Sequence, residues 1–320
     1  MTLRLQILSV PSEVFINWPK WNSLLANIHL CALFHAQDLK RYGFSEVLAP
    51  VVRDIKVLEK DGIEIPLYGG RVRGSVVQVT GDNLGIHSLF GLVESFSARY
   101  CCRFCLAEKD DFQTEFSEES SKIVLRTKDT HMAHCQEMAD NPSLPYVFGV
   151  KRSSLLNSLT YFHTTQNFSV DVMHDILEGV AQYELKLLFL YFKEQHGTLE
   201  ELNSRIQSFD YGFMERNNKP AAVNLGGESN DLGLNAVQSW CLLRNTPLLF
   251  GDLVTPSDQR WSLLLLLLQI INIVFSAMLS QGMCVYLKHL IVEHHKLFKT
   301  LYQLADIPCH FSEELAVWSQ

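Results

Sequence analysis

The sequence lacks a surplus of positive charge, an internal repeat and the features of a secretory leader. It holds 27 Lys and Arg residues against 35 Asp and Glu residues, which gives a formal net charge of -8 at pH 7. This charge balance excludes a surface that is basic all over. Nucleic-acid contacts depend on Lys and Arg side chains that neutralise phosphates, so any such contact would have to use local basic patches. Residues 1–10 lack the charged, apolar and small-residue blocks of a signal peptide, so we expect a nuclear or cytoplasmic protein that is not secreted.

Charged residues are scarce, at 19% of the 320 residues, whereas hydrophobic residues make up 47%. Such a composition excludes disorder over most of the length, because enough apolar surface is present to offset the entropy lost on folding. The length fits one large domain or two ordinary ones.

One apolar run raises the alternative of a membrane-associated protein. Residues 262–279 contain six successive leucines and are long enough to cross a bilayer. Gln269 and Asn272 lie near the middle of the run, and each would need a polar partner in lipid. No basic cluster flanks the run, so we favour a helix buried in a large core.

Hydrophobic periodicity predicts a mixed, helix-rich protein. In the first half, the apolar spacing predicts helices over 22–44 and 54–59, and Asp61-Gly62 predicts a break after them. A strand is expected over 72–80 and a helix from Leu84 to about Ala98. In the second half, 171–196 predicts a long amphipathic helix that stops at Gly197. Thr198 and Glu201 have the spacing of a capping box, 217–235 is a Gly- and Asn-rich loop, and 261–304 is apolar and helical.

The segment 101–153 is polar and would be an unusually long connection unless something fixes it. It contains a C-x2-C pair followed, after 25 residues, by an H-x2-H pair. Two thiolates and two imidazoles complete the tetrahedral shell of a structural zinc ion, so the predicted ligands are Cys102, Cys105, His131 and His134. Cys101 and Cys135 are alternative ligands. The alternative interpretation has no metal ion, and the cysteines then form a buried thiol pair while the histidines are exposed to solvent.

Carboxylates mark two further positions. Asp82 lies where the expected strand gives way to a helix, which suits either a metal ligand or a turn residue. Asp171 and His174 share one turn at the head of a helix, with Glu178 one turn beyond, although Asp171 also suits a simple helix cap.

The run from Val77 to Cys105, which includes Thr-Gly-Asp-Asn-Leu-Gly-Ile-His, resembles transposase-derived proteins of animal genomes, near the CACTA/EnSpm-like and Zisupton-type groups of cut-and-paste DNA transposons. The run Asp-Val-Met-His-Asp-Ile-Leu-Glu-Gly-Val over 171–180 shares this resemblance, which extends over nearly everything from Asn22 onward, including 286–295. The resemblance implies an RNase H-like fold in which two Asp and one Glu bind two Mg²⁺ or Mn²⁺ ions for DNA strand cleavage and transfer.

On that template Asp82 matches the second Asp, and Asp171 with His174 matches an Asp-x-x-His motif whose role is positional. The family's first Asp belongs to an acidic motif that has no counterpart in residues 1–21. The family's last Glu is expected near or beyond residue 320, and Glu178 and Glu293 are poor substitutes for it. We therefore expect a sequence cut at both ends, with a vestigial catalytic site that binds Mg²⁺ weakly.

These observations predict an incomplete RNase H-like core of mixed α/β class, with segments 1–21 (non-matching), 22–100 (partial core), 101–153 (zinc insert) and 154–320 (helical remainder). The function expected is that of a degenerate transposase domain, and a zinc-stabilised DNA- or protein-binding module is the alternative. A further alternative is an active nuclease in which Asp38 or Asp54 supplies a missing catalytic carboxylate. A local basic patch for DNA would consist of Lys122, Arg126, Lys128, Lys151 and Arg152.

Overall fold

The computed structural model describes residues 4–10, 32–66, 69–117, 119–226 and 230–307, and it divides the chain into two compact units. Unit 1 comprises Met1–Arg103 and Arg126–Val170, and unit 2 comprises Phe104–Leu125 and Asp171–Gln320. The polar segment 101–153 is therefore shared between the two units.

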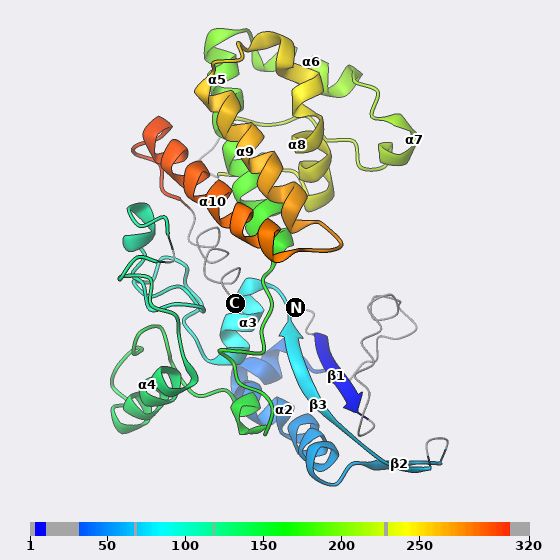
Figure 1. Ribbon diagram of the computed structural model, residues 1–320, viewed down its shortest axis with the longest axis vertical. Coiled ribbons are helices and arrows are strands. Elements are labelled where there is room, and N and C mark those ends of the chain that lie inside the picture. Colours follow the sequence, from blue (N-terminus) through cyan, green and yellow to red (C-terminus); the bar gives the residue numbers. More distant parts are fainter. Residues whose placement is uncertain (1–3, 11–31, 67–68, 118, 227–229, 308–320) are drawn as a thin grey trace. The chain divides into compact units, whose positions relative to one another are not determined.

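Unit 1 contains a small antiparallel sheet and its helices, which can be followed in Figure 1. Its elements are β1 (Arg4–Val10), α2 (Ala36–Lys60), β2 (Ile63–Ile65), β3 (Gly70–Thr80), α3 (Asn83–Phe90), α4 (Lys128–Asp140) and the 3₁₀ turn η4 (Leu155–Ser158). The strand order is β1-β3-β2, so β3 is the central strand. The strand expected over 72–80 is thereby confirmed.

Both sides of β3 are paired near its C-terminal end. Arg4 of β1 lies opposite Thr80, and on the other side Val79 forms a parallel bridge with Phe168. The register of β1 and β3 shifts between Gln6 and Ile7, which leaves one extra residue on β3. This bulge explains why Val76 and Val79, three residues apart, are both buried in a strand that otherwise alternates.

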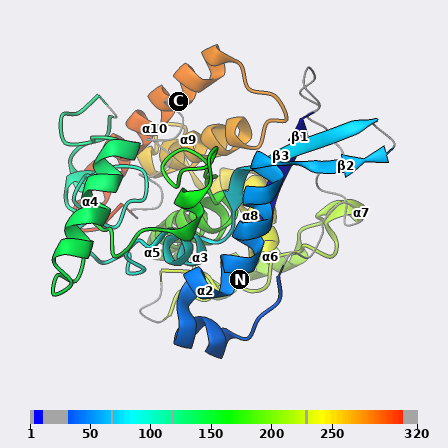
Figure 2. The ribbon, with the colours of Figure 1, turned by 90° about the horizontal axis from the view of Figure 1, so that it is seen from below.

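Helix α2 packs along β3, as Figure 2 shows from below. It is kinked at Gly43, and its apolar face buries Phe44, Leu48, Val52 and Ile55. The predicted break is confirmed, because the helix ends at Lys60 and Gly62 adopts a positive φ of 68°. The expected helix over 22–44 is wrong at residues 32–35, which are not helical because α2 begins only at Ala36, and its part before residue 32 lies outside the described residues.

Helix α3 is shorter than the sequence pattern predicts. It stops at Phe90 because Gly91 takes the left-handed conformation, with a φ of 75°, and its N–H donates to the carbonyl of His87. Leu92 and Val93 continue the helical spacing of the preceding apolar residues, which is why the sequence predicts a helix to about Ala98. Both residues are buried, but they are not helical.

Unit 2 is almost entirely helical. Its elements are the 3₁₀ turn η3 (Asp111–Gln113), the π-helix η5 (Met173–Val180), α5 (Ala181–Gln195), α6 (Leu199–Ser208), α7 (Gly212–Glu215), α8 (Ala236–Phe250), the 3₁₀ turn η6 (Gly251–Leu253), α9 (Gln259–Val274) and α10 (Gln281–Leu301). The expected helix over 171–196 is confirmed as η5 and α5 in succession. The capping box is also confirmed, because Thr198 and Glu201 exchange side-chain to backbone hydrogen bonds at the start of α6.

The leucine run lies in α9 and faces the core of unit 2. Leu263, Leu264, Leu267, Ile270 and Ile271 are buried in one cluster with residues of η5, α5, α8 and α10. None of the helices in the described parts of the chain is both long and apolar enough to span a bilayer. The interpretation of this run as a buried core helix is therefore confirmed.

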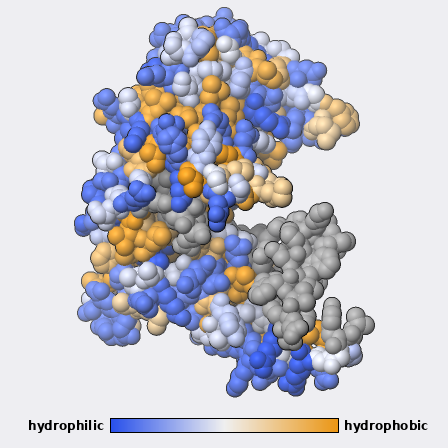
Figure 3. Space-filling model, in the orientation of Figure 1, coloured by the Kyte–Doolittle hydropathy of each residue, from blue (hydrophilic) through white to orange (hydrophobic). Residues whose placement is uncertain are grey.

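The architecture confirms a mixed, helix-rich class, with a single small sheet among the described residues. Figure 3 shows hydrophilic side chains over the C-terminal half of α2 and a group of apolar ones at α7, where Phe213 and Met214 are exposed.

Candidate functional site

The C-terminal end of β3 carries Asp82, the predicted second carboxylate. The strand ends two residues earlier, at Thr80, and Asp82 is the N-cap of α3. Its Oδ1 accepts a hydrogen bond of 2.7 Å from the N–H of Gly85, while Oδ2 has no hydrogen bond within the described part of the chain. Asp82 thus follows a central strand, as predicted, and one of its two oxygens is committed to capping.

A buried guanidinium lies beside this position. Arg103 donates from Nη1 to Oδ1 of Asn83 at 2.6 Å, and its Nη2 lies 3.5 Å from the carbonyl oxygen of Ser169. The side chain is only 3% exposed. Arg103 therefore connects the residue after Asp82 to the segment that follows the Phe168 bridge, at the same end of β3.

The bridging segment is fixed to β3 by side chains as well. Gln78 donates from Nε2 to the carbonyl of Phe168 at 2.8 Å, and Asn167 donates from Nδ2 to the carbonyl of Val77 at 2.7 Å. The N–H of Val79 also donates to the carbonyl of Asn167. Because backbone and side-chain hydrogen bonds fix residues 167–168 to β3, the end of β3 is a rigid place at which to present polar groups.

Asp171 and His174 are brought together in unit 2. Nδ1 of His174 lies 2.5 Å from Oδ2 of Asp171, and the backbone N–H of His174 donates to Oδ1 at 3.3 Å. On the other side of the ring, Nε2 lies 3.8 Å from Oε2 of Glu178. Asp171 is nearly buried, whereas about two fifths of the His174 side chain is exposed. The carboxylate thus orients the imidazole and leaves Nε2 accessible, which is the arrangement of an oriented base or ligand.

The π-helical turn gives this cluster its spacing. Residues 173–180 wind with i to i+5 hydrogen bonds, an arrangement that is frequent at functional sites. Glu178 is anchored as well, because its Oε1 accepts a bond of 3.3 Å from the N–H of Ala236 at the start of α8. The positional role of the Asp-x-x-His motif stays a prediction. Asp82 belongs to unit 1 and the motif belongs to unit 2.

Among the predicted zinc ligands, the two histidines turn in different directions. Nε2 of His131 lies 3.5 Å from Sγ of Cys135 and 3.4 Å from Oγ1 of Thr164. His134 instead stacks on Phe148, with 4.7 Å between ring centroids. Burial, followed by the charges of His163, Arg126 and His134, lowers the pKa of His131 to about 4, so this imidazole is neutral at physiological pH.

The two cysteines of the C-x2-C pair are buried and are assigned to different units, Cys102 to unit 1 and Cys105 to unit 2. Within the described ranges, no three His, Cys, Asp or Glu side chains stand close enough together to hold a metal ion as they are placed. The zinc ligand set remains a prediction.

The expected basic patch is largely engaged in contacts within each unit. Arg126 is buried and donates to the carbonyls of Cys102 and Phe148, and Arg152 donates to the carbonyl of Ser88 at 2.6 Å. Lys122 pairs with Asp111 and Glu115, and Lys151 pairs with Glu94. Arg126 therefore serves the structure of unit 1 and cannot belong to a surface patch. Lys128 is exposed.

The remaining candidates are widely separated along the chain. Asp38 and Asp54 are both exposed on α2, and Glu293 pairs with His289 on the surface of α10. Sequence reasoning missed Arg103, which lies inside the C-x2-C pair, and His163, whose buried ring contacts His131 edge-on at 5.4 Å. A charged residue flanked by aromatic and thiol side chains is the signal that could have indicated a buried Arg103.

No protein-family model matches the chain, and a search of curated proteins found no match.

Proposed function

We propose that the chain is a transposase-derived, RNase H-like domain that binds nucleic acid and does not cleave it. The resemblance of the runs around Asp82 and Asp171 supports the origin, and the contacts of Arg103 support the loss of cleavage. An active site of this class needs a cluster of carboxylates around two divalent ions.

The observation that carries the proposal is the buried guanidinium at the end of β3. Arg103 is held by Asn83, the immediate neighbour of Asp82, and by the backbone of Ser169. A fixed positive charge repels a divalent ion placed near it, and most strongly where the surroundings exclude water. The helix-capping bond from Gly85 further commits one oxygen of Asp82. A metal ion at Asp82 would have to overcome both effects.

Nucleic-acid binding and cleavage can be tested with the same labelled duplex. The protein should retard the duplex in a gel and leave both strands intact after incubation with Mg²⁺ or Mn²⁺. The Asp82→Asn variant should bind equally well, because Asn also caps helices. Metal-dependent cleavage that disappears in Asp82→Asn would refute the loss of activity, and the absence of any retardation at low salt would refute binding.

A second candidate, a zinc-stabilised binding module, rests on the buried imidazoles of unit 1. Nδ1 of His131, Nδ1 of His134 and Nε2 of His163 are buried, and within the described part of the chain none has a hydrogen-bond partner. Buried polar atoms of this kind call for an explanation such as water or an ion. Cys102, Cys105, His131 and His134 would be the ligands of a structural zinc ion with no open coordination position.

Elemental analysis of the purified chain tests this candidate. We expect about one zinc per chain, falling to near zero in Cys105→Ser, because loss of one thiolate opens a structural shell. The matched control is Cys241→Ser, which alters a buried thiol of α8 instead. Full zinc retention in Cys105→Ser, or a metal-free wild type, would refute the predicted ligand set.

A further inference from the structure

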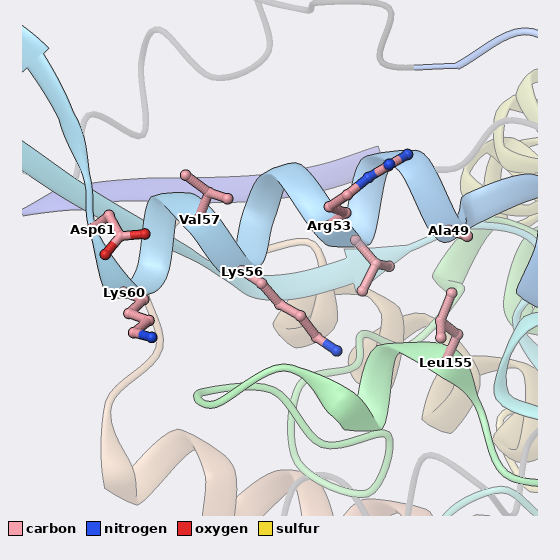
Figure 4. A pocket seen from close by; sticks show the side chains of 8 residues that line it. Ala49, Arg53, Lys56, Val57, Lys60, Asp61 and Leu155 are labelled. Atoms are coloured by element: carbon pink, nitrogen blue, oxygen red, sulfur yellow. The ribbon is translucent and has the colours of Figure 1, made fainter.

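The C-terminal half of α2 lines an open groove in unit 1 with a cavity volume of about 400 Å³. We call it the α2 groove, and the residues that matter for its chemistry are Val52, Arg53, Lys56, Lys60, Asp61 and Leu155. Figure 4 shows Lys56 and Lys60 extending from the same side of α2, with Lys56 and Leu155 directed into the same space. Arg53 extends in the other direction in this view, with its guanidinium on the side of α2 away from the Lys56 and Lys60 amino groups.

The three cations of the α2 groove are not used by the described structure. Arg53, Lys56 and Lys60 are exposed, and none forms a hydrogen bond or ion pair with a described residue. This distinguishes them from Lys151 and Arg152, whose head groups already hold protein acceptors. Their charges are therefore available to an external anion.

The surroundings of the cations strengthen their attraction for an anion. Val52 is buried beneath the groove and Leu155 lies across from α2, so part of the wall is apolar. Long basic side chains pack their stems on such a surface and present their charges at its margin. Opposing negative groups are the carboxylate of Asp61 in the lining, the carboxylates of Asp54 and Glu59 on the same helix, and the negative end of the helix dipole. The lining itself carries three cations and one carboxylate.

We propose that the α2 groove binds the sugar–phosphate backbone of DNA, an inference that rests on the proposed nucleic-acid-binding function. Arg53, Lys56 and Lys60 follow one another at i, i+3 and i+7 on α2. At about 1.5 Å of rise per residue, they extend over roughly 10 Å of helix. Consecutive phosphates of one DNA strand rise about 3.4 Å along the duplex axis but lie farther apart along the winding strand, so the three cations can reach roughly two to three phosphates. The contact reads charge and spacing and carries no base specificity.

Fluorescence anisotropy of a labelled duplex, titrated with the whole chain at several salt concentrations, tests the inference. The variant is the triple substitution Arg53→Gln, Lys56→Gln and Lys60→Gln. Loss of three phosphate contacts should weaken binding by about tenfold or more at low salt and reduce the steepness of log K against log[salt] by up to about 2.7, because each contact contributes about 0.9.

The matched control carries Lys40→Gln, Lys193→Gln and Lys296→Gln, three exposed cations outside the groove. It changes the net charge by the same amount, so a general charge effect would weaken both proteins equally. If the wild type binds and the groove variant retains its affinity and salt dependence, the groove is not the site, while the proposed function stands. Equal weakening in the two variants also refutes the groove. Absence of binding by the wild type refutes both proposals. Far-UV circular dichroism of each protein verifies that it is folded.

Discussion

At the scale of single residues, Asp82 and Arg103 have complementary roles at the end of β3. Asp82 caps α3 through Gly85, and Arg103 is bound to Asn83, the first residue of that helix. Both side chains stabilise the turn from strand to helix. The structural role of Asp82 can be separated from any catalytic role by choosing substitutions that differ in capping ability.

We expect Asp82→Ala to lower the free energy of unfolding by about 1 kcal/mol, because Ala cannot accept the hydrogen bond from the N–H of Gly85. Asp82→Asn should have a much smaller effect, since Asn is as good an N-cap as Asp. Urea unfolding followed by circular dichroism gives both values. Equal destabilisation by the two substitutions would show that the carboxylate charge, and not the cap, is what matters.

A second residue-scale prediction concerns His295, which is fully buried in α10. Burial, with a smaller contribution from the neighbouring His294, lowers its pKa to about 3, although the hydrogen bond to the carbonyl of Ile291 opposes the shift. His294 is itself bonded to Glu184, the charged partner on the facing helix. Because the unfolded chain has a His pKa of about 6.5, it binds a proton that the folded chain excludes in the intervening pH range.

The stabilising effect of the neutral His295 is therefore complete above about pH 6.5 and is lost as the pH falls toward 3, by up to about 1.4 kcal/mol per pH unit. In His295→Leu the unfolding free energy should depend less steeply on pH between about 6.5 and 4. Denaturant unfolding across this range measures the slope. An unchanged slope would mean that His295 is protonated in the folded state.

At the scale of elements, the close approach of Gly179 to the preceding turn of the π-helix provides a prediction that a small change can test. A Cβ added at Gly179 would lie 2.9 Å from the carbonyl oxygen of His174, which is too close for a real contact. In an ordinary helix Gly→Ala stabilises by roughly 0.5–1 kcal/mol. Gly179→Ala should therefore have the opposite sign and destabilise unit 2.

The matched control is Gly282→Ala in α10, where the nearest atom to an added Cβ is the Ser280 oxygen at 3.9 Å. This change should stabilise by about the ordinary amount. Thermal unfolding of both variants gives the comparison. Stabilisation by Gly179→Ala would mean that this turn can become α-helical without cost, and that the spacing of His174 and Glu178 does not depend on it.

A polar contact between α5 and α10 provides a further prediction at this scale. Nε2 of His294 lies 2.9 Å from Oε1 of Glu184, and both side chains are almost fully buried. His294→Leu would remove the partner of a buried carboxylate and should destabilise by about 3–5 kcal/mol. Adding Glu184→Leu to the same protein should recover much of that loss, because no buried charge then remains. Additive losses in the double variant, measured by urea unfolding, would contradict this explanation.

Local signals in the sequence predicted several elements well. β3 was expected from its β-branched residues, the start of α6 from Thr198 and Glu201, and the end of α2 from Asp61-Gly62. Each of these depends on residues within one turn or one strand. The early end of α3 was missed, because Leu92 and Val93 have helical spacing even though Gly91 has already reversed the chain.

Contacts between distant residues could not be read from the sequence. Asp171 and His174 were expected to lie together because they share a turn, and they do. The bond from Arg103 to Asn83 and the parallel bridge from Val79 to Phe168 join segments that are 20 and about 90 residues apart. No local pattern specifies such pairs. The π-helical winding of 173–180 was likewise hidden, because its apolar spacing also fits an α-helix.

At the scale of the molecule, the net charge of -8 remains the strongest general argument against nucleic-acid binding, so the charge must be unevenly distributed. The α2 groove supplies such a local excess of positive charge in unit 1. We therefore expect binding that depends strongly on salt and little on base sequence.

The most direct test is the affinity of the wild-type chain for a labelled DNA duplex, measured by anisotropy from about 50 to about 200 mM salt. Binding through a few phosphate contacts should weaken steadily over this range, with log K falling linearly against log[salt] and a slope near -3. An affinity that does not change with salt, or no binding at about 50 mM, would contradict the central claim that this domain binds nucleic acid through its phosphates.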